Sequence, residues 1–168
     1  MNALPRGWFH RAEGDDYVKM RNVAATLVLA ALASRLCLLR AQAPAAESRT
    51  AWDGVYTEDQ AKRGELIYGK ECAACHGDML AGRESAPPLT GSAFLANWNG
   101  LTMGDLFDRI RKTMPQSAPG RLTRQQDADI LAFMLSVNKF PAGKTELYRQ
   151  SEMLREIRFE ATKPASKK

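Results

Sequence analysis

Apolar side chains recur at helical spacing in three stretches of the chain, and each stretch begins just after a threonine. Thr57 and Thr123 are followed three residues later by a glutamine and Thr102 by an aspartate, a spacing typical of helix N-terminal caps. Gly64 lowers the helix propensity of the first stretch, which suggests that another helix approaches closely there. The pattern therefore predicts three main helices, over residues 58–70, 103–113 and 124–138.

The remaining pattern predicts loops rather than a sheet. No stretch alternates apolar and polar residues for long enough to indicate a β-strand. Residues 72–100 read as one long loop, punctuated by Gly77, Gly82, Pro87, Pro88, Gly91 and Gly100. After Gly143 we expect one short helix from Glu146 to Ile157, followed by a basic tail. The expected fold is all-α, with three main helices and long loops.

The first 43 residues have the pattern of a targeting segment. An apolar run over residues 23–33 is preceded by Arg21 and followed by Ala41-Gln42-Ala43, the kind of small-residue sequence at which signal peptides are cut. The apolar run is short for a membrane span. We expect a cleaved signal peptide, with an uncleaved N-terminal anchor as the alternative, and residues 1–19 are untranslated if synthesis starts at Met20.

This interpretation divides the chain into four parts. A signal peptide or anchor over residues 1–43 is followed by a flexible leader over 44–56, which is rich in Pro, Ala, Ser and charged residues. The three predicted helices form one domain over residues 57–143, and residues 144–168 form a C-terminal extension.

The charge of the chain does not indicate a nucleic-acid partner. The formal net charge is +5, but six of the 24 basic and three of the 19 acidic side chains lie before Ala43, which leaves 18 against 16. A surface so nearly balanced lacks the basic footprint that binds a phosphate backbone. We therefore expect no nucleic acid among the partners, and a membrane only if the N-terminal segment is retained as an anchor.

Candidate chemistry is concentrated in Cys72-Ala73-Ala74-Cys75-His76. Loss of the leader also removes Cys37 and His10, so these are the only cysteines and the only histidine expected in the mature chain. C-x-x-C-H is the attachment motif of c-type haem, because the two thiols can add to two vinyl groups on one porphyrin edge. The following imidazole is then placed to bind the iron. The motif predicts one covalent haem c, with Cys72, Cys75 and His76 in the site.

Other uses of a cysteine pair fit this sequence less well. A thioredoxin-like pair follows a strand in a βαβ frame, and no strand pattern precedes Cys72. A zinc site requires further Cys or His ligands, which the mature chain lacks. A structural disulfide between the two cysteines remains as the other alternative.

The sixth iron ligand is sought among the methionines, since bis-histidine ligation is excluded within a monomer that has one histidine. Met79 lies on the His76 side of the ring, and Met103 and Met134 are interpreted as core packing. Met153 falls in the C-terminal extension. Met114 remains, because it follows a helix, enters a loop and is braced by Pro115. His76 and Met114 are therefore the predicted metal ligands.

Several motifs resemble those of the class I cytochrome c family over roughly residues 57–143. They are Gly64 and Tyr68, Cys72 to Gly77 with the haem motif, Ala86-Pro87-Pro88-Leu89-Thr90-Gly91, Met114-Pro115, and Phe133 on the last helix. The resemblance implies the cytochrome c fold, in which the first and last helices cross at the small residue and stack an aromatic there. It also implies that the Pro87 carbonyl binds the second nitrogen of His76.

The resemblance extends less closely to a functional subgroup. The loop from Gly82 to Gly100, with Phe94 and Trp98, is similar to that of small bacterial cytochromes that accept electrons from periplasmic quinoprotein dehydrogenases. Trp98 is a candidate for haem packing or for a hydrogen bond to a propionate, with plain core packing as the alternative. Arg83 is a weaker propionate candidate, and a solvated loop arginine is the preferred interpretation.

These observations predict a periplasmic or otherwise exported electron carrier that is not itself an enzyme. Single electrons would pass between redox partner proteins, such as a quinoprotein dehydrogenase or a terminal oxidase, through a His/Met-ligated haem. The alternatives are a haem subunit fixed in a dehydrogenase or oxidase complex, and an open haem site that binds a gas or reduces peroxide.

Overall fold

The computed structural model describes residues 49–84 and 86–165. The predicted signal peptide or anchor, the Met20 start, Cys37 and His10 all lie outside the described residues. None of the described helices is both long enough and apolar enough to cross a membrane.

Three main helices form as expected, and the all-α cytochrome c fold is confirmed. They are α2 (Glu58–Glu71), α5 (Met103–Thr113) and α6 (Arg124–Val137). Each begins after its predicted threonine, whose hydroxyl oxygen accepts a hydrogen bond from the backbone N–H three residues on. At Thr102 and Thr123 the cap is reciprocal, because the side chains of Asp105 and Gln126 accept from the backbone N–H of the threonines.

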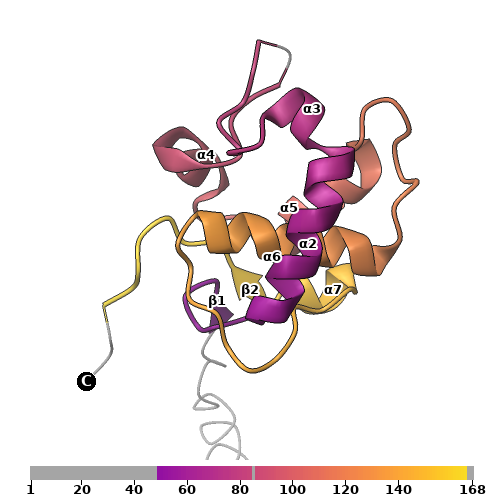
Figure 1. Ribbon diagram of the computed structural model, residues 1–168. Helices are drawn as coiled ribbons and strands as arrows, with labels where there is room; N and C mark the ends of the chain where they lie inside the picture. The colour runs from indigo at the N-terminus through magenta and orange to yellow at the C-terminus, as the bar shows by residue number, and fades with distance from the viewer. Residues whose placement is uncertain (1–48, 85, 166–168) are drawn as a thin grey trace, which may run out of the picture. The chain divides into compact units, whose positions relative to one another are not determined.

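Helices α2 and α6 cross at Gly64 (Figure 1). A β-carbon on Gly64 would lie 1.8 Å from the backbone oxygen of Asp129, so the two backbones touch there. One turn further along α2, the ring of Tyr68 packs against Phe133 with centroids 5.3 Å apart. The crossing at a small residue and the aromatic stack implied by the resemblance are thus both confirmed.

The expectation of one long loop over residues 72–100 is wrong in two places. The stretch contains α3 (Ala73–His76) and α4 (Gly91–Trp98). The glycines that suggested a loop mark the ends of a helix instead, since Gly91 and Gly100 both have positive φ at the two ends of α4. Asn138 fixes the start of α4, because its side chain accepts from Gly91 N–H and donates to the Leu89 carbonyl.

The C-terminal segment differs most from expectation. The helix expected from Glu146 to Ile157 is only α7 (Ser151–Leu154), because the backbone at Leu147 exchanges two hydrogen bonds with the Gln60 side chain on α2. A strand then follows, β2 (Ile157–Arg158), which pairs in parallel with β1 (Arg49–Thr50). The expectation of no sheet is thus wrong by one pair of short strands.

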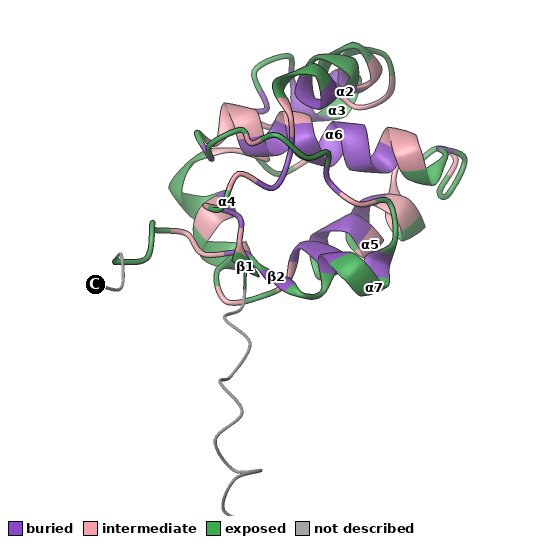
Figure 2. Ribbon diagram, turned by 90° about the horizontal axis from the view of Figure 1, so that it is seen from below, coloured by how far each residue is buried: buried purple, intermediate pink, exposed green. Residues whose placement is uncertain are grey.

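The segment after residue 143 supplies part of the same core as the three main helices. Leu147, Leu154, Ile157 and Phe159 are each at most 3% exposed. Figure 2 shows buried residues on β2 and α7 as well as on α5 and α6. Close packing at α5 requires Gly104, where a β-carbon would lie 2.8 Å from the Ser151 carbonyl oxygen of α7. The segment is therefore built into the fold of the domain.

A substitution of Thr102 tests the cap of α5. Thr102→Ala is expected to lower the free energy of unfolding by about 1 kcal/mol at neutral pH. Hydrogen bonds from Thr102 hold the pKa of Asp105 below its ordinary value of 3.8. A carboxylate with a lowered folded-state pKa stabilises the fold above its unfolded-state pKa and loses that contribution as the pH falls through the folded-state value.

The cost of Thr102→Ala should therefore shrink in strong acid, as measured by denaturant unfolding at a series of pH values. Thr123→Ala is the matched control, because its capping partner Gln126 does not titrate. A cost for Thr102→Ala that stays constant in acid, as for Thr123→Ala, would contradict this role of Asp105.

Candidate haem site

The two cysteines and the histidine of the motif lie on one turn of chain at the end of α2. Cys72 closes α2 by donating its N–H to the Tyr68 carbonyl at 2.9 Å. The N–H groups of Cys75 and His76 both donate to the Cys72 carbonyl, at 3.1 and 3.0 Å, and this forms the single turn of α3. Cys72 is half-buried and Cys75 is exposed, and both thiols are free. One turn thus presents both thiols and the imidazole from a common support.

The His76 imidazole is buried and its orientation is fixed. Its Nδ1 lies 2.9 Å from the Pro87 carbonyl oxygen. A carbonyl can only accept, so Nδ1 carries a proton, and in the neutral imidazole Nε2 then keeps its lone pair. An imidazole held in this way is typical of a metal ligand, because the hydrogen bond fixes both tautomer and ring direction. This places Pro87 where the resemblance put it; its role toward the haem stays a prediction.

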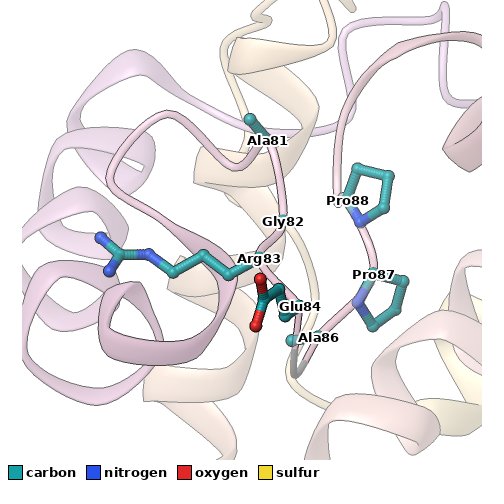
Figure 3. Close-up of a pocket in the computed structure, with 7 residues that line it drawn as sticks. All are labelled: Ala81, Gly82, Arg83, Glu84, Ala86, Pro87 and Pro88. Atoms are coloured by element: carbon teal, nitrogen blue, oxygen red, sulfur yellow. The ribbon is translucent and has the colours of Figure 1, made fainter.

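The loop that carries Pro87 folds back on the motif. Gly82 donates its N–H to the His76 carbonyl at 2.9 Å, and a β-carbon on Gly82 would lie 2.6 Å from the Pro88 nitrogen. The loop lines a pocket of about 440 Å³ formed by Ala81, Gly82, Arg83, Glu84, Ala86, Pro87 and Pro88. In Figure 3 the Arg83 side chain points away from the two proline rings. Arg83 is exposed, in agreement with a solvated loop arginine.

The methionines are placed much as their sequence positions suggested. Met103 and Met134 are buried in the core at 0% and 2% exposure, whereas Met79 is 78% exposed and Met153 is 38% exposed. Met114 is half-buried in extended backbone directly after α5, next to the buried Pro115. Of the methionines that the structure describes, Met114 combines partial burial with a place outside a helix, and its ligand role stays a prediction.

Trp98 lies at the last position of α4 and is half-buried. Its ring packs near Phe94, with centroids 6.4 Å apart, and Phe94 in turn packs edge-on against Phe159 at 6.0 Å. This arrangement links Trp98 to the core through Phe94. A contact between Trp98 and the haem stays a prediction.

Sequence reasoning missed Asp127 on α6. Its side chain is fully buried, and both carboxylate oxygens lack a hydrogen-bond partner within the described residues. Burial raises its pKa to about 6, although Arg111 and Arg124 act in the opposite direction. Its position in the sequence could have revealed that it is buried. Asp127 lies three and four residues before Ile130 and Leu131, so it shares the apolar face of the helix with them.

The groups present fit a covalently bound haem c. Burial raises the pKa of the Cys72 thiol to about 11, with smaller contributions from Asp127 and Cys75, so the thiol is neutral at ordinary pH. Two unpaired thiols on one helical turn meet the requirement for two thioether bonds, and His76 Nε2 meets the requirement for an axial nitrogen. Cys72 and Cys75 would hold the ring and His76 the iron.

A match to a family model supports this assignment. The model of the family described as cytochrome c oxidase, cbb3-type, subunit III matches residues 59–134. Among solved structures, a chain of the sulfane dehydrogenase SoxCD from Paracoccus pantotrophus is similar, with 22% sequence identity and a TM-score of 0.43. That match covers 65% of this chain and 62% of the SoxCD chain. No curated protein matches the chain. Residues 59–134 therefore form a class I cytochrome c domain, which implies a haem electron carrier with covalently bound haem c, and Cys72 and Cys75 are present for its attachment.

Proposed function

We propose that this cytochrome transfers single electrons between redox partner proteins outside the cytoplasm, through a haem iron bound by His76 and Met114. The observation that carries the proposal is the His76 imidazole, which is buried and held by the Pro87 carbonyl so that Nε2 is free to bind iron. The haem supplies the one-electron Fe(III)/Fe(II) couple.

Both proposed ligands are supported from the backbone. His76 lies on α3 and is fixed by Pro87, and Met114 follows directly on α5, where its N–H donates to the Ile110 carbonyl at 2.9 Å. Ligands held by helix ends need little movement when the charge of the iron changes. Such a site favours electron transfer over binding of a gas or peroxide, which requires an open position.

Electrons would enter and leave near Cys75. Its side chain is exposed, and the neighbouring Met79 is 78% exposed, so this edge of the site faces solvent. The charge of the chain after Ala43 is nearly balanced, so docking there should be weak and only partly electrostatic. A quinoprotein dehydrogenase as donor, or a terminal oxidase as acceptor, fits this description.

A second candidate function is that of a haem subunit fixed in an oxidase complex. The matching family model favours it, because its description names an oxidase subunit. However, residues 144–168 offer few apolar side chains for docking to such a complex. Four of them are already buried in the domain itself: Leu147, Leu154, Ile157 and Phe159. Size-exclusion chromatography of the native chain, followed at the haem absorbance, separates the two: a carrier elutes near 18.6 kDa or below and a subunit elutes in a large complex.

Substitution of Met114 tests the ligand set. Met114→Ala should abolish the near-infrared band between methionine sulfur and ferric iron. It should also lower the reduction potential on the order of 0.2 V, part of the roughly 0.8 V range that axial ligands cover.

Met79→Ala is the control, because this methionine is exposed and lies three residues after His76. It should keep both the band and the potential. A band that survives Met114→Ala would overturn the assignment of Met114, and its absence in the unmodified protein would favour the open site.

A further inference from the structure

Asp127 is a buried acid that has no role in the proposed binding of the haem iron. It lies in the first turn of α6, with an exposed fraction of 0%. Neither of its oxygens has a hydrogen-bond partner within the described residues. Asp129, two residues on, is also buried but is fully paired, since it accepts from Arg63 Nε and Nη2 at 3.1 Å each and from Gln125 at 2.9 Å. A buried carboxylate without hydrogen bonds is costly when charged, which raises its pKa. Nearby charges then change that pKa readily, because little solvent screens them.

The charged groups around Asp127 come from three elements. Its charge acts on Cys72 at the end of α2, where the haem is attached. Arg111 in the last turn of α5 and Arg124 at the start of α6 act on Asp127 and favour its charged form. Arg121, just before α6, is paired with Glu71, the last residue of α2. This pair brings the start of α6, which carries Asp127, close to the predicted haem-attachment turn that follows α2.

We propose that Asp127 is a proton acceptor that takes up a proton when the haem is reduced and releases it when the haem is oxidised. An electron from a redox partner converts Fe(III) to Fe(II), and a proton from solvent binds a carboxylate oxygen of Asp127. Oxidation returns the electron to the next partner and the proton to solvent. The proposal rests on the electron-carrier role but not on the identity of the sixth ligand.

Electrostatics gives the direction of this coupling. Reduction removes one positive charge from the haem centre, and in a buried site that loss is weakly screened. The carboxylate is then less stabilised, so its pKa is higher in the reduced than in the oxidised protein. The pKa of Asp127 is already raised to about 6, which places the exchange within reach of ordinary solution conditions.

The test is a redox titration of the haem-loaded protein at a series of pH values. The reduction potential of the unmodified protein should fall as the pH rises through the pKa of Asp127. A tenfold difference in proton affinity between the redox states corresponds to a total fall of about 59 mV. Asp127→Asn should remove this part of the pH dependence.

Asp129→Asn is the matched control, because it removes a buried carboxylate from the same helix that is already held by Arg63. It should keep the pH dependence of the unmodified protein. Haem propionates titrate in every variant, so the difference between Asp127→Asn and Asp129→Asn isolates Asp127. Equal pH dependence in the two variants would overturn the proposal.

Infrared difference spectra between the reduced and oxidised states give a second readout. The unmodified protein should gain the C=O band of a protonated carboxyl on reduction, and Asp127→Asn should lack that gain. No gain at any pH near 6 would also overturn the proposal. A protein that does not exchange electrons reversibly in these titrations would instead contradict the electron-carrier function, so the two failures are distinguishable.

Discussion

Replacing Gly64 with alanine is expected to lower the free energy of unfolding by about 3 kcal/mol, at the upper end of the cost of overpacking. The added β-carbon would lie 1.8 Å from the Asp129 carbonyl oxygen and 2.4 Å from its carbonyl carbon. Both are backbone atoms, so no side chain can rotate away, and α2 and α6 must separate. Separation would also weaken the Tyr68–Phe133 stack beside the crossing.

Gly69→Ala on the same helix is the control. No heavy atom lies within 4 Å of a β-carbon built on Gly69, so alanine should raise the free energy of unfolding by about 1 kcal/mol through helix propensity alone. Chemical denaturation of the haem-loaded variants measures both values. Opposite signs for the two substitutions are expected; an equal gain at both positions would show that the helices do not cross at Gly64.

Phe159→Ala is expected to cost about 3–5 kcal/mol, the usual range for removal of a buried phenylalanine. The side chain is 0% exposed, and its ring packs edge-on against Phe94 at 6.0 Å and Phe140 at 5.2 Å. Its backbone bonds to Gly100 and Leu101, so residue 159 joins the C-terminal segment to the turn between α4 and α5. Loss of the ring leaves a cavity that these fixed neighbours cannot close.

Met153→Ala lies in the same segment but is 38% exposed, so it should change the free energy of unfolding by no more than about 0.5 kcal/mol. Denaturant unfolding of the two variants shows whether the C-terminal segment is part of the core or only lies on its surface. A small cost for both substitutions would mean that the C-terminal segment is an appendage.

Local signals made the main helices predictable. Capping depends on residues three apart, so Thr102 with Asp105 and Thr123 with Gln126 could be recognised without any tertiary information. The haem motif is equally local, because both cysteines and His76 occupy one turn. The proposed electron-transfer site was therefore largely visible in the sequence.

Contacts distant in sequence explain what was missed. Helix α4 is fixed in part by Asn138, which bonds to Gly91 across 47 positions, and no local pattern records that contact. The C-terminal segment pairs with β1 and with Gln60, so its register depends on residues far earlier in the chain. Asp127 was missed because a single acid on an apolar face is an exception to the periodic pattern that identified the helix.

The pairing of β1 with β2 also bears on the order in which the molecule can be assembled. Near this pair, the indole N–H of Trp52 bonds to the Glu160 carbonyl across 108 positions. Closing so long a loop carries an entropic cost and makes such contacts slow to form. During synthesis, which starts at the N-terminus, Cys72 and Cys75 are made before residues 157–160, which complete the fold. The turn that carries the two cysteines thus forms from local contacts, whereas the pairing of β1 with β2 must wait for the longest loop in the domain to close.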